Sequence, residues 1–355
     1  MAKWKGKKLS VEIYGTSHAP EIGVKAEGFP KEEISLTKLT EFMERRKAKK
    51  AIYSTPRIEA DAPVFLSGLR NGIVTGECLH AVIYNQNTKS SDYNELYAKP
   101  RPSHADYAAY LKDGRLDFSG GGEFSGRLTA PYCIAGGIAK ELLEKRGVQI
   151  CAYVRSIGTV TGKNFTNADF SIESLKYEES FPSLSNGDAM LEEIAKARAL
   201  GDSVGGVVDC VVRGAPKGVG GALFDGLEGK LANLIYAIPA VKGVSFGEGF
   251  TLSKMFGSEA NDPLCVDEQG DIRLKTNRAG GINGGITNGE AITLSVAFRP
   301  TPSISKPQKT VNLTTGKEEE ISIKGRHDAC IVPRALPVVE SAVALGLLDE
   351  ILDKE

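Results

Sequence analysis

The chain has 355 residues, of which 41% are hydrophobic and 25% charged, with a formal net charge of −1 at pH 7. This composition is ordinary for a soluble globular protein with a substantial core. The near-zero net charge argues against a general nucleic-acid binder. No run approaches the roughly 20 apolar residues that a membrane span requires.

The cysteines and the basic N-terminal residues favour a cytoplasmic protein. The first eight residues lack the long apolar run of a signal peptide. No Cys-x-x-Cys pair occurs, which favours reduced, mostly buried thiols over a disulfide framework or a zinc site. We therefore expect no bound metal. The six cysteines are residues 78, 133, 151, 210, 265 and 330.

The N-terminal third predicts strands, one helix and a loop-rich segment over 85–117. Alternating apolar and polar residues predict strands over 9–15, 22–28, 62–67 and 79–84. The helix is predicted over 35–50, with Thr37 as its N-cap. Basic residues crowd its C-terminal end, which is typical both of a solvated helix end favoured by the dipole and of an anion site.

Further along the chain, a long helix is predicted to begin at Ser125 or Thr129 and to end near Gly147. The order strand, helix, strand occurs around this helix and again around 224–236, which suggests an internal duplication. Since no Pro/Ser-rich linker divides the halves, we expect one α/β unit over 1–355. The other predicted elements are strands over 148–154 and 204–212, a polar surface insertion over 161–187, and helices over 188–200, 224–236 and 333–352.

Three of the four histidines lie in polar loops beside residues that could share a proton with them. They are His18, His104 and His327, whereas His80 is typical of a core or edge position. Because histidine changes charge near neutral pH, their surroundings favour a shared polar site over separate structural roles.

Three glycine- or hydroxyl-rich segments could hold a ligand. Residues 120–127 open the long helix with an arginine in its first turn, which suits a phosphate, although a structural turn is as good an explanation. This segment matches neither a Walker A loop nor a dinucleotide fingerprint. Residues 277–286 contain two Gly-Gly pairs that could lie against a planar ligand or another chain. Residues 298–307 could bind a phosphate or form an extended surface loop.

Arginines gather in or near these segments, beside the carboxylate of Asp328. Guanidinium groups bind carboxylates and phosphates bidentately, so the set predicts a polyanionic small-molecule ligand. The arginines are residues 45, 46, 57, 101, 127, 299 and 326.

Over nearly its whole length the sequence resembles chorismate synthase. The resemblance implies a β-α-β sandwich with helices packed between antiparallel sheets, usually assembled as a homotetramer. It is carried by Gly15-Thr16-Ser17-His18, Arg101-Pro102-Ser103-His104-Ala105-Asp106, Gly201-Asp202-Ser203-Val204-Gly205-Gly206, Ala240-Val241-Lys242-Gly243-Val244, Gly257-Ser258-Glu259 before Asn261-Asp262, the double Gly-Gly segment, and Gly325-Arg326-His327-Asp328.

The resemblance implies the 1,4-anti elimination of phosphate from 5-enolpyruvylshikimate 3-phosphate, which yields chorismate for aromatic amino acid biosynthesis. Reduced FMN is required without net redox change, and NADPH would serve only as a flavin reductant. By matching position, His18 would assist the departing phosphate as an acid. His104 would supply or hold a proton near the reduced flavin, and Asp328 would work with flavin N5 in removing the C6 proton.

The resemblance also assigns binding residues by position. The substrate's carboxylates and phosphate would be held by Arg45, Arg57 and Arg127. The flavin-contacting positions would be Arg46, Ser125, Ala240, Gly284, Arg299, Pro300, Thr301, Pro302, Ser303 and Arg326.

Several positions depart from the family pattern. Glu123 stands where an arginine is expected near the phosphate, and Ile52 stands where bifunctional members carry a second arginine associated with pyridine nucleotide. We therefore predict a divergent member whose flavin contacts have shifted, with weak or no intrinsic flavin reductase activity. The alternative is a paralogue that kept the fold as a flavin- or anion-binding module but lost turnover. Smaller departures are Thr16, Lys47-Ala48-Lys49, Pro239 and Arg299.

Overall fold

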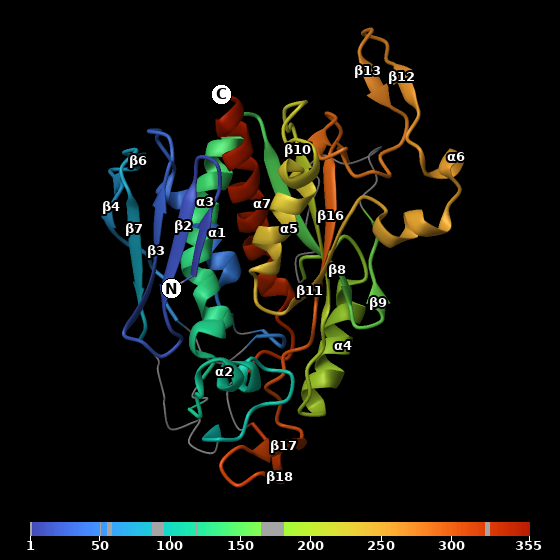
Figure 1. The fold of residues 1–355 in the computed structure, drawn as a ribbon. Coiled ribbons are helices and arrows are strands. Elements are labelled where there is room, and N and C mark those ends of the chain that lie inside the picture. Colours follow the sequence, from blue (N-terminus) through green and yellow to red (C-terminus); the bar gives the residue numbers. More distant parts are fainter. Residues whose placement is uncertain are drawn as a thin grey trace.

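The computed structural model describes residues 2–49, 51–54, 59–86, 96–117, 120–164, 181–323 and 327–355. Two five-stranded antiparallel sheets face each other across helices that fill the space between them (Figure 1). This arrangement confirms the mixed α/β sandwich that the sequence predicts.

The first sheet is built by the N-terminal part of the chain and has the strand order β1-β2-β3-β7-β4. Along β3, alternate residues Ile22, Val24 and Ala26 are buried because successive side chains of a strand point to opposite faces. The strands are β1 (Ala2–Lys5), β2 (Ser10–Gly15), β3 (Glu21–Glu27), β4 (Val64–Ser67) and β7 (Leu79–Tyr84).

The second sheet has the order β11-β16-β10-β8-β9. Strand β16 shows strict alternation, and Ile292, Leu294 and Val296 are all buried. Strand β10 also buries residues on its other face, because the segment after residue 180 packs there. The strands are β8 (Gln149–Ile157), β9 (Val160–Thr161), β10 (Gly206–Arg213), β11 (Val241–Phe246) and β16 (Ile292–Phe298).

Four helices occupy the space between the sheets, with α3 against the first sheet and α7 against the second. Helix α7 is apolar on nearly all sides and is buried almost from end to end, as a helix without a polar face must be. Gly136 lets α3 approach α7 closely, because a Cβ there would collide with Ser341. The four helices are α1 (Leu36–Arg46), α3 (Thr129–Lys145), α5 (Leu227–Tyr236) and α7 (Val332–Lys354).

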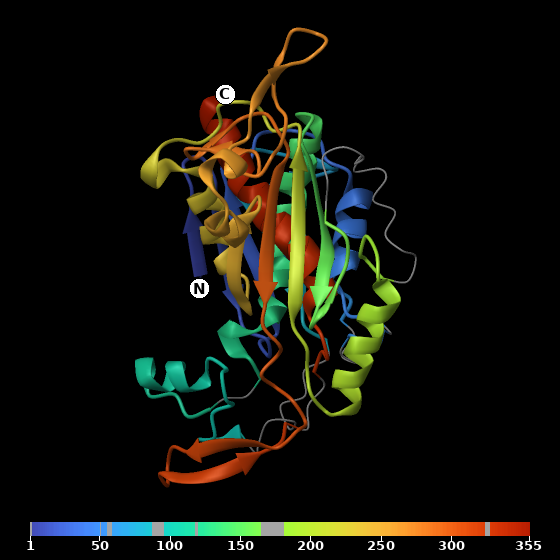
Figure 2. The same cartoon turned by 90° about the vertical axis from the view of Figure 1, so that its right-hand side faces the viewer.

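Smaller elements project from the two ends of the sandwich. Figure 2 shows a hairpin of β12 (Leu264–Val266) and β13 (Ile272–Leu274) at one end, and β17 (Gln308–Asn312) and β18 (Lys317–Ile321) at the other. Helix α2 (Asp106–Asp113) contacts the second hairpin, because Tyr110 packs against the cluster that contains Ile321, and α4 (Gly187–Ala199) lies beside β8 and β9. The remaining short elements are β5 (Leu69–Arg70), β6 (Ile73–Val74), α6 (Gly257–Ala260), β14 (Ile282–Asn283) and β15 (Ile286–Thr287).

Several sequence-based boundaries need correction. Ser35, not Thr37, caps α1 by accepting a hydrogen bond from the backbone of Lys38, and α1 ends at Arg46 because Lys47 is extended. The segment over 85–117 was expected to be loop-rich but contains α2. Most of the predicted insertion over 161–187 lies outside the described residues.

The two strand–helix–strand stretches that suggested a duplication are connected differently. Helix α3 links β7 of the first sheet to β8 of the second, whereas α5 links β10 and β11 within the second sheet. The similarity between the halves therefore lies in the two antiparallel sheets rather than in repeated β-α-β units.

Candidate active site

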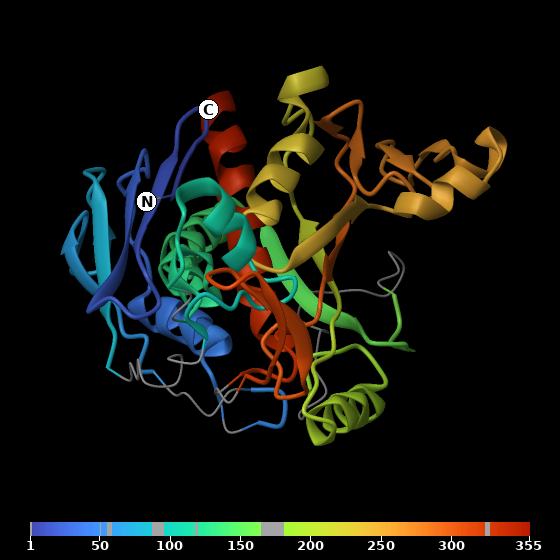
Figure 3. The same ribbon diagram turned by 60° about the horizontal axis from the view of Figure 1, so that its bottom comes forward.

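A cavity of about 310 Å³ lies where loops from both halves meet, and Figure 3 looks toward this end of the molecule. Its walls come from the C-terminal end of α1, the turns before α3, the loop before β11, the segment after β16 and the start of α7. Five guanidinium groups are among the lining residues, which are otherwise a mixture of glycine, hydroxyl, apolar and acidic residues. The five are Arg46, Arg101, Arg127, Arg299 and Arg334.

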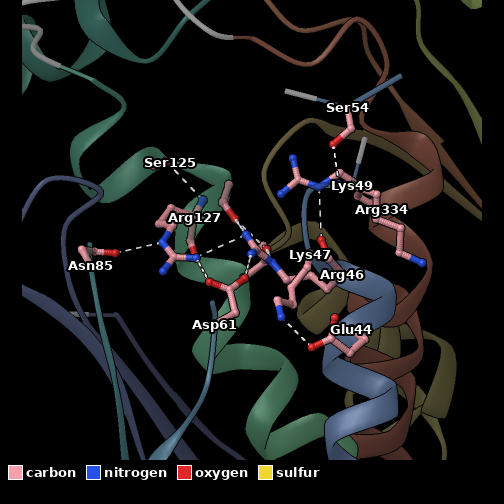
Figure 4. Close-up of polar contacts among 12 residues, drawn as sticks. Glu44, Arg46, Lys47, Lys49, Ser54, Asp61, Asn85, Ser125, Arg127 and Arg334 are labelled. Carbon is pink, nitrogen blue, oxygen red and sulfur yellow. Dashed lines mark hydrogen bonds and ion pairs between the residues drawn. The ribbon is translucent and has the colours of Figure 1, made fainter. Parts of the chain in front are cut away.

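One buried carboxylate holds two of these arginines from opposite directions (Figure 4). Asp61 accepts a 2.7 Å ion pair from Nη1 of Arg46 at the end of α1, and a second from Nη1 of Arg127 in the turn before α3. Arg46 also donates to the carbonyl of Gly126 (2.9 Å) and to Thr129 Oγ1 (3.0 Å). Asp61 therefore joins two elements that are far apart in sequence and fixes their guanidinium groups at the cavity wall.

The electrostatics of this cluster follow from its burial. Burial alone would raise the pKa of Asp61, but Arg46 and Arg127 outweigh it and the pKa is lowered. Burial also lowers the pKa of Arg127, against the opposing effect of Asp61. Arg127 donates through Nε to Asn85 (3.0 Å), while its buried Nη2 has no hydrogen-bond partner among the described residues. A buried donor without a partner is costly, so this nitrogen is suited to a ligand oxygen.

His104 is oriented by the residue two positions later. Its Nδ1 forms a short hydrogen bond with Oδ1 of Asp106, which also accepts a bidentate ion pair from Arg101 at 2.7 and 2.8 Å. Burial would raise the pKa of Asp106, but hydrogen bonds from Arg101 and His104 lower it to about 2. Because the carboxylate of Asp106 is ionised at neutral pH, the proton of this hydrogen bond lies on Nδ1 of His104. The other ring nitrogen, Nε2, is therefore the one available to the cavity.

His18 lies directly behind the cavity wall rather than in its lining. Its Nδ1 is 2.9 Å from the hydroxyl of Ser17, and its ring packs against Gly120, which lines the cavity. Gly120 has a φ of +61°, and a Cβ there would collide with the imidazole. The glycine is therefore needed for the ring to lie this close to the backbone.

Asp328 lines the cavity and is paired with an arginine of α7. Its Oδ2 accepts a 2.6 Å ion pair from Nη1 of Arg334, and its carbonyl accepts a hydrogen bond from Thr301. Arg334 donates in addition to the carbonyl of Arg46, so it links Asp328 to the cluster around Asp61. Burial lowers the pKa of Arg334.

The segment that follows β16 forms a further part of the lining. The backbone of Arg299 donates to the carbonyl of Ala240 (3.0 Å), which has a φ of +74°. Ser203 fixes the next turn by donating to the carbonyl of Thr301 (2.7 Å). Burial lowers the pKa of Arg299. Ala240, Arg299, Thr301, Pro302 and Ser303 all line the cavity.

The structure brings many of the sequence-predicted site residues together. The cavity lining includes His104, Asp328, Arg46, Ser125, Arg127, Ala240, Arg299, Thr301, Pro302 and Ser303, together with His327. Pro300 lies within the same segment but is not itself in the lining. Arg57 and Arg326 lie outside the described residues.

Other predicted residues are placed elsewhere. Arg45 does not line the cavity and forms a bidentate ion pair with the buried Glu340 of α7, at 2.7 and 2.9 Å. Gly284 lies in the turn between β14 and β15 and is also absent from the lining. Glu123 lies outside the lining and pairs with the half-exposed Arg115 at 3.2 Å. Ile52 does not reach the cavity either.

Sequence reasoning assigned no site role to three residues that shape the cavity. Asp61 and Arg334 line it, and Asp106 lies behind His104. Asp106 falls in the same segment as Arg101 and His104, so the spacing of two residues between aspartate and histidine was the available signal. Asp61 carries no local signal, because both of its partners are distant in sequence.

The guanidinium groups of the cavity, and Nη2 of Arg127 above all, suit a ligand that carries phosphate or carboxylate oxygens. The volume lies at the lower end of the range for small-molecule sites.

Among the described residues, no group of three or more His, Cys, Asp or Glu side chains is arranged to hold a metal ion. Within the same ranges, no helix is long and apolar enough to cross a membrane.

Comparisons with known proteins agree on one family. The chorismate synthase family model matches residues 9–352. A chorismate synthase of Thermococcus gammatolerans is 44% identical over 99% of this chain and 98% of its own length. One of Pyrococcus abyssi is 45% identical over 98% and 97%. A crystal structure of a chorismate synthase has the same fold, with a TM-score of 0.72 at 23% identity over 99% of this chain and 93% of that one. The chain belongs to the chorismate synthase family.

Proposed function

We propose that this cavity is where the chain, a carbon–oxygen lyase, eliminates phosphate from 5-enolpyruvylshikimate 3-phosphate to form chorismate, with reduced FMN as cofactor. The observation that carries the proposal is the convergence of five arginines with His104 and Asp328 in one cavity. The substrate carries a phosphate and two carboxylates, and such a set of guanidinium groups matches that charge.

The chain's own groups would hold the substrate and handle the protons. Arg127 would bind an anionic oxygen through Nη2, while Arg299 and Ser303 would contact the flavin together with Ser125 and Ala240.

His104 would hold a proton at Nε2, since Nδ1 is engaged by Asp106. Asp328 would hold the proton that leaves C6, and His18 would assist the departing phosphate. Reduced FMN, when bound, supplies transient electron density without net redox change.

The finer assignments are part of the same proposal. We propose a cytoplasmic homotetramer in which NADPH acts only as a flavin reductant. The paralogue without turnover is not favoured, because the two departures that motivated it, Glu123 and Ile52, are both outside the cavity lining, and Glu123 pairs with Arg115.

The proposal is tested by anaerobic turnover of the purified chain with pre-reduced FMN and 5-enolpyruvylshikimate 3-phosphate. We expect chorismate and inorganic phosphate in equal amounts. His104→Ala should lower kcat on the order of 10²-fold or more, because it removes a proton-transfer group. The control is His80→Ala, whose ring bonds Tyr14 in the first sheet and should leave kcat unchanged. A folded wild-type protein that forms no chorismate would refute the proposal.

A further inference from the structure

Asp106 contacts two groups that face the cavity and is itself absent from its lining. Its side chain is 4% exposed and accepts hydrogen bonds from His104 Nδ1, from Nε and Nη2 of Arg101, and from the backbone N–H of Arg101 at 2.9 Å. A carboxylate with this many donors is held in one orientation, and it holds its partners in turn. Asp106 is therefore placed to act on the reaction without touching a bound molecule.

The position of Asp106 in the chain explains how it reaches both partners. It is the first residue of α2, and Arg101 lies in the turn that precedes that helix. Ser103, between them, has a φ of +58°, which folds the turn back so that Arg101 and His104 face the same carboxylate. A non-glycine residue in this conformation carries a conformational cost, which the surrounding hydrogen bonds must offset.

Arg101 extends the same unit to the other histidine. Its Nη2 donates to the carbonyl of Gly120 at 2.6 Å, and Gly120 is the residue against which the ring of His18 packs. Its Nη1 lies 3.4 Å from the hydroxyl of Ser303. The ion pair of Arg101 with Asp106 therefore fixes the backbone beneath His18 as well as the ring of His104.

We propose that Asp106 is a positioning residue. It determines which ring nitrogen of His104 carries the proton in the neutral form and, through Arg101, fixes the backbone of Gly120 against which His18 packs. The inference deepens the proposed function and rests on it for its kinetic consequence. When a carboxylate accepts from Nδ1–H, the imidazole presents Nε2 to the cavity in one tautomer and one orientation. An amide in place of the carboxylate can donate to Nδ1 instead, which selects the opposite tautomer.

The test compares Asp106→Asn with the wild type. The variant should lose on the order of 10²-fold or more in kcat, as expected when a catalytic histidine takes the wrong tautomer, with KM changed by less than about threefold. Asp106→Glu, which keeps the charge, should recover part of the loss. The matched control is Asp349→Asn, because Asp349 is likewise a buried carboxylate with several donors, in its case three backbone N–H groups, but lies in α7 beside residues 7–9. That control should retain the wild-type kcat.

A second measurement does not depend on turnover. In protein labelled with ¹⁵N-histidine, His104, assigned through His104→Ala, should carry its neutral-form proton on Nδ1 in the wild type and partly on Nε2 in Asp106→Asn. The inference is overturned if the neutral form of wild-type His104 carries its proton on Nε2, or if Asp106→Asn keeps kcat within threefold of the wild type. A wild-type protein without activity would remove the proposed function but leave the tautomer measurement to decide the role of Asp106.

Discussion

At the scale of single residues, carboxylates decide how the arginines of the cavity are presented. Asp61 pairs with Nη1 of Arg127, whose Nη2 has no partner in the part of the chain that the structure describes, whereas Asp106 engages Nε and Nη2 of Arg101 together. Arg334 is paired with Asp328. A guanidinium has several donors in a rigid fork, so pairing on one side leaves the other side aimed in a fixed direction.

Arg127→Lys tests this directional effect. Lysine can keep a charge near Asp61, but it cannot reach Asp61, Asn85 and a ligand oxygen at once. We expect KM for 5-enolpyruvylshikimate 3-phosphate to rise about tenfold or more, corresponding to the loss of one charge-assisted hydrogen bond of roughly 1.5–3 kcal/mol.

The matched control for this prediction is Arg115→Lys. Arg115 lies close by in the chain but pairs with Asp113 and Glu123, outside the cavity lining. Steady-state kinetics should show an unchanged KM for that variant. Equal KM values for the wild type and Arg127→Lys would contradict the role given to Nη2.

At the scale of elements, Glu340 joins four parts of the structure. This fully buried carboxylate of α7 accepts from Arg45 of α1 (2.7 Å), from Lys140 of α3 (2.8 Å) and from the backbone of Ala152 in β8 (2.9 Å). Burial would raise the pKa of Glu340, but Arg45 and Lys140 lower it to about 2. The ionised carboxylate therefore stabilises the folded state at neutral pH.

Glu340→Gln should lower the free energy of unfolding by about 3 kcal/mol at pH 7, because two cations then lose their buried counter-ion. The folded-state pKa of about 2 lies below the unfolded value of 4.5. The contribution is thus present above about pH 4.5 and is lost as the pH falls toward 2. Denaturant unfolding of the wild type and of Glu340→Gln should show that their difference in free energy of unfolding is smaller at pH 3 than at pH 7. A difference that grows in acid would contradict the assignment.

How far the sequence predicted these elements depended on the strength of the local pattern. The long apolar helix ending near residue 352, the glycine-bounded α3 and the alternating strand β3 were recognisable, because the local periodicity and the caps are clear there. The strands β17 and β18 were not predicted, since a segment such as Lys317–Ile321 is mostly charged and pairs only in its tertiary context. The same limit hid Asp61, whose partners lie 15 and 66 positions away. Motif residues such as His104 and Arg299 were singled out by their polar loops and charge, and the resemblance then supplied their specific roles.

At the scale of the whole molecule, the two sheets are joined through the contact between α3 and α7. Gly136 brings these helices close together, since an added Cβ would collide with both the side chain and the backbone of Ser341. Gly137, its neighbour, leaves room for Leu39 and Phe42 of α1. Because helices interdigitate at nearly crystalline density, one methyl group at this contact has to displace a neighbouring element.

Gly136→Ala should therefore destabilise the protein by about 1–3 kcal/mol, despite the better helix propensity of alanine. Gly229→Ala is the matched control, because Gly229 lies in α5 and an added Cβ there meets nothing within 4 Å. That substitution should stabilise the protein by up to about 1 kcal/mol. Thermal and denaturant unfolding should place the two variants on opposite sides of the wild type. A stabilised Gly136→Ala protein would show that the helices can separate without cost.

The pairing of arginines with Asp61, Asp106 and Asp328 bears on product escape. An arginine cluster without counter-ions would retain inorganic phosphate tightly after the carbon–oxygen bond breaks. In this cavity the protein's own carboxylates already pair with the arginines. A free phosphate dianion therefore has to compete with these carboxylates for the guanidinium groups. At the proposed site, a molecule that spans several guanidinium groups at once would gain more contacts than a small dianion, which would favour the intact substrate over the fragment that it releases.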